Sequence, residues 1–172
     1  MIPITRRGFL KVSGGVAAGV AIGVPDVLHA ATLAPETQGR VNLPYPLHSI
    51  AKKQQLQTNT PVPFSYPDAS SPCALLKMGH AVPGGVGPDR DIVAYSLLCT
   101  HMGCPVAYDA ERRVFKCPCH FSIFDPEHAG QMVSGQATEK LPSIVLQYDP
   151  KDESVHAVAI EGLIYGRQSN LL

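Results

Sequence analysis

The chain has 172 residues, enough for one domain with a sizeable core, since 45% of its residues are hydrophobic. Its 14 basic and 14 acidic residues cancel, and charged residues make up only 16% of the sequence. We therefore expect no nucleic-acid partner, which would need clustered Lys and Arg. The low aromatic content, with 15 Gly and 16 Pro, predicts an all-β fold of short strands and tight turns.

The first 30 residues are typical of an export signal. Arg6 and Arg7 precede a nearly uncharged run of small and apolar residues from Val12 to Val24, and small residues follow at Ala30. This pattern predicts a twin-arginine (Tat) signal over residues 1–30 and a periplasmic location. The apolar run is too short to span a bilayer as a helix, which takes about 20 residues. The alternative is an uncleaved N-terminus that anchors the chain; otherwise we expect membrane association to be absent or peripheral.

Tat export usually carries proteins that fold before they cross the membrane, often around a cofactor, so the signal hints at a metal centre loaded in the cytoplasm. Cleavage after Ala30 would remove three of the 14 basic and one of the 14 acidic residues. The remaining 11 basic and 13 acidic residues would make the mature chain mildly acidic.

The mature chain, residues 31–172, reads as short strands separated by turns. Residues 31–60 are polar and interrupted by prolines, which predicts an extended arm without a helix. Residues 61–66 and 73–78 predict a hairpin, and glycines make residues 79–90 a loop.

Further strands are expected where short apolar runs are bounded by turn residues. These runs are 91–98, 114–116, 143–148 and 154–160. A polar stretch at 108–112 predicts the tip of a hairpin, and the last two strands predict another hairpin. The expected architecture is an antiparallel β-sandwich or barrel with a smaller lobe, built of loops, at about 93–139.

Four of the five cysteines and two of the seven histidines fall within 22 residues. They occur in two groups: Cys99, His101 and Cys104, then Cys117, Cys119 and His120. Cys-x-His in the first group and Cys-x-x-His in the second each offer one thiolate and one imidazole. A Rieske-type [2Fe–2S] cluster needs two thiolates on one iron and two imidazoles on the other. Two loops folded against each other can supply that set.

Two other interpretations of these residues remain open. Two Cys and two His also suit a tetrahedral zinc ion, although a single residue between Cys and His is unusual for zinc. Two disulfides with incidental histidines would leave the Cys–His spacing unexplained. If the cluster is present, neutral imidazoles remove negative charge from it and raise its potential to about −150 to +300 mV, against about −400 mV for plant-type ferredoxins.

The run CTHMGC followed by CPCHFS resembles the double loop of Rieske iron–sulfur proteins. This resemblance implies the Rieske fold and a [2Fe–2S] cluster. It implies that the cluster ligands are Cys99, His101, Cys117 and His120. It also implies that Cys104 and Cys119 bridge the two loops as a disulfide, which the periplasm would allow to persist.

Two positions after His120 bear on the potential of that cluster. The family pattern commonly runs Gly-Ser-x-Tyr-Asp, whereas this chain has Phe121-Ser122-Ile123-Phe124-Asp125. Ser122 matches the serine that donates to a cluster sulfide, but Phe124 stands where a tyrosine would donate to a ligand sulfur. Because such a donor stabilises the reduced cluster, we expect a potential below that of quinol-oxidising Rieske proteins.

Within the Rieske family, the chain resembles the small subunit of arsenite oxidase in three further segments, 84–96, 120–142 and 163–172. This resemblance implies an electron-transfer subunit without a catalytic site of its own. A large molybdopterin subunit, its partner in a heterodimer, would oxidise arsenite and pass electrons one at a time through this chain to a cytochrome c or azurin-type acceptor. The alternative is the Rieske subunit of a quinol-oxidising cytochrome bc-type complex.

Several other residues are not assigned a role in the chemistry. Cys73 is expected to be a buried free thiol, because its neighbours are apolar. Arg112 and Arg113 are expected at a solvated hairpin tip. The apolar residues of the tail at 163–172 either pack on the domain or dock on the large subunit, and we expect docking. The remaining histidines, among them His128, have no partner at ligand spacing.

Overall fold

The computed structural model describes residues 44–171, which are almost entirely β. The predicted signal and the first part of the predicted arm lie outside this range. The strands of the described part are β1 (His48–Lys52), β2 (Val62–Ser65), β3 (Pro72–Lys77), β4 (Ile92–Ser96), β5 (Ala107–Asp109), β6 (Val114–Lys116), β7 (Ile123–Asp125), β8 (Gln131–Ser134), β9 (Ser143–Asp149) and β10 (Ser154–Glu161). Two short 3-10 helices, η1 (Lys53–Gln55) and η2 (Pro126–His128), complete it. The all-β prediction is confirmed.

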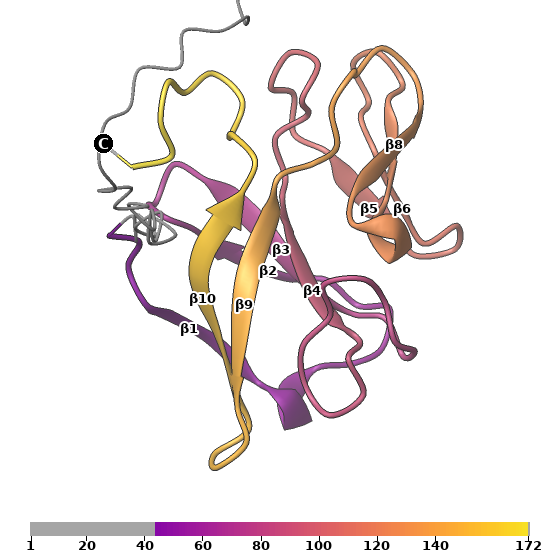
Figure 1. The fold of residues 1–172 in the computed structure, drawn as a ribbon. Coiled ribbons are helices and arrows are strands. Elements are labelled where there is room, and N and C mark those ends of the chain that lie inside the picture. The colour runs from indigo at the N-terminus through magenta and orange to yellow at the C-terminus, as the bar shows by residue number, and fades with distance from the viewer. Residues whose placement is uncertain (1–43, 172) are drawn as a thin grey trace, which may run out of the picture. The chain divides into compact units, whose positions relative to one another are not determined.

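Six strands form a large antiparallel sheet in the order β1-β10-β9-β4-β3-β2. The sheet curls so that its two edge strands approach each other, as the rings of His48 on β1 and Phe64 on β2 stack with centroids 6.2 Å apart. The Tyr66 hydroxyl, just after β2, also donates to the Pro46 carbonyl before β1 at 2.9 Å. The sheet is therefore close to a closed barrel (Figure 1).

The central strands β3 and β4 are buried on both faces, which explains their nearly continuous apolar sequence. Because side chains alternate along a strand, Cys73 and Leu75 of β3 enter the core inside the large sheet, whereas Ala74 and Leu76 enter a second core. Along β4, Ile92 and Ala94 alternate with Val93 and Tyr95 in the same way. One sheet thus supports two hydrophobic cores.

The second core is shared with a small antiparallel sheet in the order β5-β6-β7-β8. Phe115 on β6 and Phe124 on β7 are fully buried in it. Tyr95 of β4 reaches this core, with its ring 6.0 Å from that of Phe115, and its hydroxyl donates to the Pro126 carbonyl at 2.8 Å. The small sheet lies at the end of the large sheet where β9 begins and β10 ends (Figure 1).

The structure corrects several predictions made from sequence. A strand, β1, and a single 3-10 turn, η1, lie in the stretch expected to be an arm without a helix. The lobe contains four strands and is not built of loops alone, and its strand β5 overlaps the predicted hairpin tip at 108–112. The strand predicted at 114–116 is confirmed as β6. The other three, β5, β7 and β8, are only three or four residues long, too short for apolar alternation to show. That residues 93–139 form a separate subdomain stays a prediction.

Arg113 is less exposed than its neighbour Arg112, which is exposed as expected. The Arg113 guanidinium donates to the Met78 carbonyl and pairs with Glu127 at 2.8 Å. Arg113 therefore ties the turn after β5 to the large sheet and to η2, and the prediction of a solvated tip was wrong for this residue.

The C-terminal tail, residues 162–171, packs on the domain to a greater extent than we expected. Ile164 is fully buried in the core of the large sheet, and Asn170 is buried too. Leu163 and Tyr165, on either side of Ile164, are 51% and 40% exposed. The tail as a whole therefore belongs to the fold.

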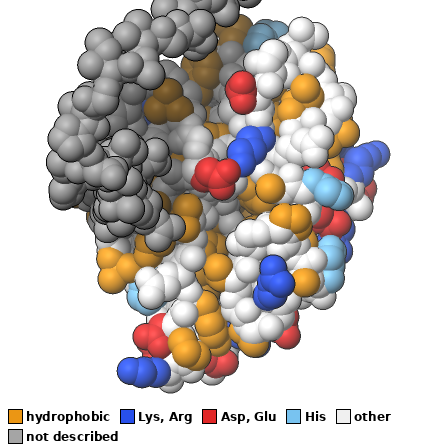
Figure 2. All heavy atoms as spheres, in the orientation of Figure 1, with side chains coloured by type: hydrophobic (Ala, Val, Ile, Leu, Met, Phe, Trp, Pro, Cys, Tyr) orange, Lys and Arg blue, Asp and Glu red, His pale blue; other side chains and the backbone are white. Residues whose placement is uncertain are grey.

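Across the described residues, no helix has the length and apolarity needed to cross a membrane. On the face shown in Figure 2, side chains of both charges are scattered among apolar ones. That face therefore carries no continuous patch of positive or of negative charge.

Tyr95→Phe tests the link between the two sheets. We expect the substitution to lower the free energy of unfolding by about 1–3 kcal/mol, because it leaves the buried Pro126 carbonyl without its donor. Denaturant unfolding measures the change. Tyr165→Phe is the control, since the Tyr165 hydroxyl has no hydrogen bond to any described residue; equal stability of the two variants would contradict the link.

Candidate metal centre

Two loops at one end of the small sheet hold the predicted metal-binding residues. The first loop, residues 99–104, follows β4, and the second, residues 117–122, connects β6 to β7. The predicted ligands and both cysteines of the predicted disulfide are on these loops.

The two loops are closed by the same pair of backbone hydrogen bonds. In the first, the Cys99 amide donates to the Cys104 carbonyl at 2.9 Å and the Gly103 amide donates to the Cys99 carbonyl at 2.8 Å. In the second, the Cys117 amide donates to the Ser122 carbonyl at 2.8 Å and the Phe121 amide donates to the Cys117 carbonyl at 3.1 Å. Each loop therefore presents its cysteine and histidine side chains from a turn of similar shape.

This turn needs a left-handed residue at its fifth position, and the two loops meet that need differently. Gly103 has φ +73°, which glycine adopts freely. Phe121, where the family pattern commonly has Gly, has φ +60°, a conformation uncommon for a bulky residue. Its side chain is 77% exposed. An aromatic ring is thus held in solvent at the tip of the second loop, at a backbone cost of roughly 1–2 kcal/mol.

A disulfide between Cys104 and Cys119 joins the two loops. The Cys117 Sγ lies within 4.8 Å of both sulfurs of this bond. Because the disulfide sulfurs are oxidised, they are not available as thiolate ligands. The free thiols of this region are Cys99 and Cys117, both buried.

The two histidines lie beside each other at the tips of the loops. The rings of His101 and His120 are 4.7 Å apart between centroids and nearly perpendicular, at 89°. The Nδ1 atom of His101 is buried and has no hydrogen-bond partner among the described residues. A buried imidazole nitrogen without a partner is costly unless something else binds it.

Hydrogen-bond donors surround the Cys99 sulfur. Burial raises the pKa of the Cys99 thiol, and the nearby Cys117 thiol acts in the same direction, while the His101 amide and the Ser122 hydroxyl lower it by donating to the sulfur. The Ser122 Oγ accepts from the amides of Gln136 at 3.2 Å and Ala137 at 3.0 Å. These two bonds fix the position of the Ser122 hydroxyl beside the metal-binding loops.

The arrangement fits an iron–sulfur cluster with mixed ligands. The two loops carry two buried free thiols and two adjacent imidazoles, one of which has an unpartnered buried nitrogen; this is the donor set of a Rieske-type [2Fe–2S] centre. The same donor set would also fit zinc. Donor chemistry alone therefore does not distinguish an iron–sulfur cluster from a zinc ion. The relatives of the chain decide between the two.

The family of the chain decides in favour of an iron–sulfur cluster. The Rieske [2Fe-2S] domain profile matches residues 47–145, and the twin-arginine signal profile matches residues 3–23. The chain belongs to the Rieske [2Fe–2S] family. A Rieske-type cluster is therefore its cofactor, and the Tat signal directs it to the periplasm.

Full-length relatives narrow the class further. The chain is 38% identical to the iodate reductase subunit IdrB of Denitromonas iodatirespirans, over 97% of this chain and 86% of that protein. It is 36% identical to the IdrB subunit of Pseudomonas sp. (strain SCT), over 96% and 84%. Among solved structures, the soluble domain of Rieske protein II (soxF) from Sulfolobus acidocaldarius superposes with a TM-score of 0.63 at 26% identity, covering 72% of this chain and 82% of that one.

The cytochrome bc1 Rieske subunit of Corynebacterium diphtheriae matches a much shorter stretch. It is 43% identical to this chain over 39% of the chain and 17% of that subunit. The likeness to that subunit therefore concerns a part of the chain, whereas the likeness to IdrB extends over nearly all of it.

The prediction for Cys73, in the core of the large sheet, was correct, whereas some contacts of the metal-binding loops were not found from sequence. Cys73 is a buried free thiol as predicted, and burial raises its pKa to about 12. The amides of Gln136 and Ala137 were missed, because a backbone donor leaves no signature in residue types. So was Tyr165 of the tail, whose ring lies against Gly103.

Phe124→Tyr tests how the sequence around the site sets its potential. We expect the midpoint potential to rise, because a hydroxyl that reaches a ligand sulfur stabilises the reduced cluster. A tenfold change in the reduction equilibrium would move it by about 59 mV. Redox titration followed by EPR measures the shift.

Two variants control this experiment. Phe121→Tyr adds the same hydroxyl to an exposed ring of the second loop and should leave the potential unchanged. Ser122→Ala removes a donor near Cys99 and should lower the potential. A potential that stays the same or falls in Phe124→Tyr would contradict the interpretation.

Proposed function

We propose that Cys99 and Cys117 ligate one iron of the cluster and that His101 and His120 ligate the other. Four observations support this assignment: the two thiols are free and buried, the two rings are adjacent, His101 Nδ1 has no other described partner, and the remaining nearby cysteines are used in a disulfide. When bound, the cluster accepts and releases one electron at a time. The protein would hold the histidine ligands of the cluster near the surface, since His120 is exposed, and the thiolate ligands in the core, since Cys99 and Cys117 are buried.

We further propose that the chain is the electron-transfer subunit of a periplasmic oxidoreductase for an oxyanion, with arsenite as the substrate. A large molybdopterin subunit would oxidise arsenite to arsenate. This chain would carry the released electrons singly to a cytochrome c or azurin-type acceptor. The likeness over almost the whole length of the chain to iodate reductase subunits supports an oxyanion oxidoreductase. Arsenite as the substrate rests on the resemblance of residues 84–96, 120–142 and 163–172 to the arsenite oxidase small subunit.

The described residues of this chain provide electron transfer and no oxyanion chemistry. The side chains that carry chemistry gather in the two loops, and they make up a ligand set together with its supporting hydrogen bonds. The chain by itself is therefore not expected to turn over arsenite. Substrate oxidation falls to the partner subunit.

An apolar rim around the exposed histidine suits a contact with redox partners. Met102 and Phe121, at the tips of the two loops, are 58% and 77% exposed. They flank the proposed histidine ligands in sequence. A partner that covers this rim would approach the cluster from the histidine side, where the protein layer is thinnest.

Iodate reduction is a second candidate, favoured by the names of the full-length relatives. In that case electrons would flow from the donor through this chain to the large subunit. The same ligands and the same rim would serve both directions. A quinol-oxidising complex is less well supported. The cytochrome bc1 match covers only 39% of the chain, and the cytochrome b6-f subunit of Gloeobacter violaceus, which covers 81% of the chain, is only 29% identical.

Co-purification and turnover test this proposal. The tagged full-length chain, isolated from the periplasm, should bring a molybdenum-containing subunit with it, and the complex should reduce cytochrome c when arsenite is added. The chain alone should show no turnover. A complex that reduces iodate and ignores arsenite would transfer the assignment to iodate reductase, and a membrane-bound cytochrome b in place of the molybdenum subunit would overturn it.

A further inference from the structure

The tail that follows β10 returns to the end of the molecule that holds the two metal-binding loops (Figure 1). Gly162, with φ +98°, turns the chain after β10. Asn170 then closes residues 162–170 into a compact loop, because its Nδ2 donates to the Gly162 carbonyl at 2.8 Å and its Oδ1 accepts from the Ile164 amide at 2.9 Å. Such loops, packed by their own side chains, frequently carry function.

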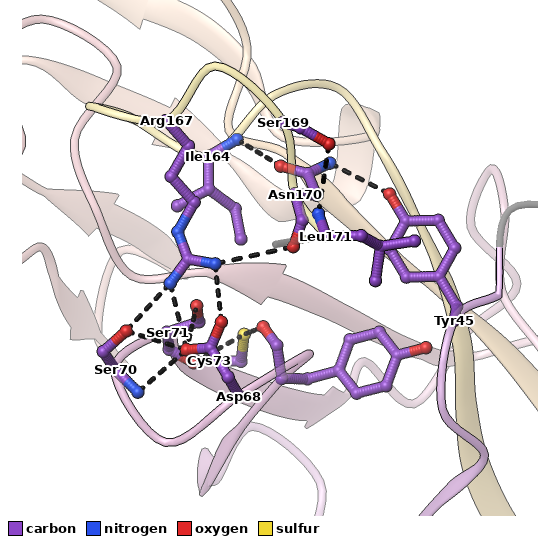
Figure 3. A network of polar contacts seen from close by, with 11 residues as sticks. Tyr45, Asp68, Ser70, Ser71, Cys73, Ile164, Arg167, Ser169, Asn170 and Leu171 are labelled. Atoms are coloured by element: carbon purple, nitrogen blue, oxygen red, sulfur yellow. Dashed lines mark hydrogen bonds and ion pairs between the residues drawn. The ribbon is translucent and has the colours of Figure 1, made fainter.

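A second contact fixes this loop to the large sheet. The Arg167 guanidinium binds both carboxylate oxygens of Asp68, at 2.6 and 3.0 Å, and the Ser70 hydroxyl at 2.9 Å (Figure 3). Asp68 lies in the turn between β2 and β3, where Ser70 and Ser71 also donate to it. The bond from Arg167 lowers the pKa of Asp68 below its usual range, so the pair stays ionised at neutral pH. The two-point geometry restricts the direction of the arginine.

Between these anchors, Tyr165 lies against the first metal-binding loop. A Cβ atom placed on Gly103 would come within 2.5 Å of the Tyr165 Cδ1 and 2.9 Å of its Cε1. The ring therefore occupies the space beside the glycine that any other residue would need. Thr100 of the same loop lines an open groove of about 380 Å³ together with Tyr165 and Arg167.

Gly103 matters to the shape of this loop for two reasons. It supplies the left-handed backbone conformation, and its amide donates to the Cys99 carbonyl at 2.8 Å. That hydrogen bond closes the turn that carries Cys99 and His101. A ring packed on Gly103 restrains the opening of this turn and keeps water from one side of it.

We propose that Tyr165 is a positioning residue for the first metal-binding loop, held in place by the Arg167–Asp68 pair. The tail then acts as a strap over the loop, and its contact limits local opening of residues 99–104. Its effect on the cluster rests on the ligand assignment proposed above. The contact itself does not depend on which oxyanion or which large subunit the protein serves.

Hydrogen–deuterium exchange on the purified, cluster-containing full chain tests the restraint directly. In Tyr165→Ala, the amides of residues 99–104 should exchange about tenfold faster, which corresponds to about 1.4 kcal/mol of lost local stability. The midpoint potential should shift and the EPR line shape should change, readouts that a merely stabilising surface contact would leave alone. Cluster loss in the presence of a chelator should also be faster.

Matched variants separate the effect of the Tyr165 ring from the effects of other parts of the tail. Tyr165→Phe keeps the ring and should behave as wild type, because the hydroxyl has no described partner. Leu163→Ala alters a more exposed apolar side chain of the same loop and should leave residues 99–104 unchanged. Arg167→Ala should loosen the same residues as Tyr165→Ala, which gives a second way to release the ring if one variant does not fold.

Unchanged exchange at residues 99–104 together with an unchanged potential in Tyr165→Ala would overturn the proposal. So would an equal effect of Leu163→Ala. If the large subunit proposed above proves wrong, the exchange result with the isolated chain still stands. The two proposals can therefore fail separately.

Discussion

The site depends on two turns that are closed by equivalent backbone hydrogen bonds. Cys99 and Cys117 stand at the start of these turns, and in both the fifth residue donates back to the cysteine carbonyl. Repeating one local shape on two loops, and joining the loops by the Cys104–Cys119 disulfide, brings two thiols and two imidazoles together without any helix. Two thiols and two imidazoles on paired loops suit a cluster with mixed sulfur and nitrogen ligands.

The rest of the fold holds these turns from several directions. Behind them, Phe115 and Phe124 form a core that the large sheet shares through Tyr95. From the side, the Gln136 and Ala137 amides hold the Ser122 hydroxyl in place. The tail adds a contact on Gly103. Rigid surroundings suit electron transfer, because little needs to move when the charge of the cofactor changes.

Sequence patterns predicted most long strands and a mixed set of thiolates and imidazoles, and the resemblance to the Rieske family implied the individual ligands and the disulfide partners. Central strands such as β4 are buried on both faces and read as continuous apolar runs, and β9 and β10 flank a clear turn. The Cys-x-His and Cys-x-x-His spacings carry the chemistry in the residue types themselves. Of these predictions, the fold and the cofactor are confirmed, while the individual ligands stay a proposal.

Other features could not be predicted because they depend on contacts distant in sequence. The strands β5, β7 and β8 are too short to show alternation, and β1 forms by pairing with β10 at the other end of the chain. From sequence Arg113 is predicted to be a surface residue, because its partners, the Met78 carbonyl and Glu127, are distant in sequence. The contact of Tyr165 with Gly103 could not be predicted either, because the tail is positioned by the pair between Arg167 and the distant Asp68.

EPR spectroscopy of the dithionite-reduced protein, combined with metal analysis, tests the central claim most directly. With two histidine ligands on one iron, the protein should contain iron and sulfide and give the signal of a mixed-valence cluster with nitrogen ligands. That signal should be lost when His101 or His120 is replaced by alanine. A protein that contains zinc and gives no EPR signal, or one whose signal persists in both histidine variants, would contradict the account.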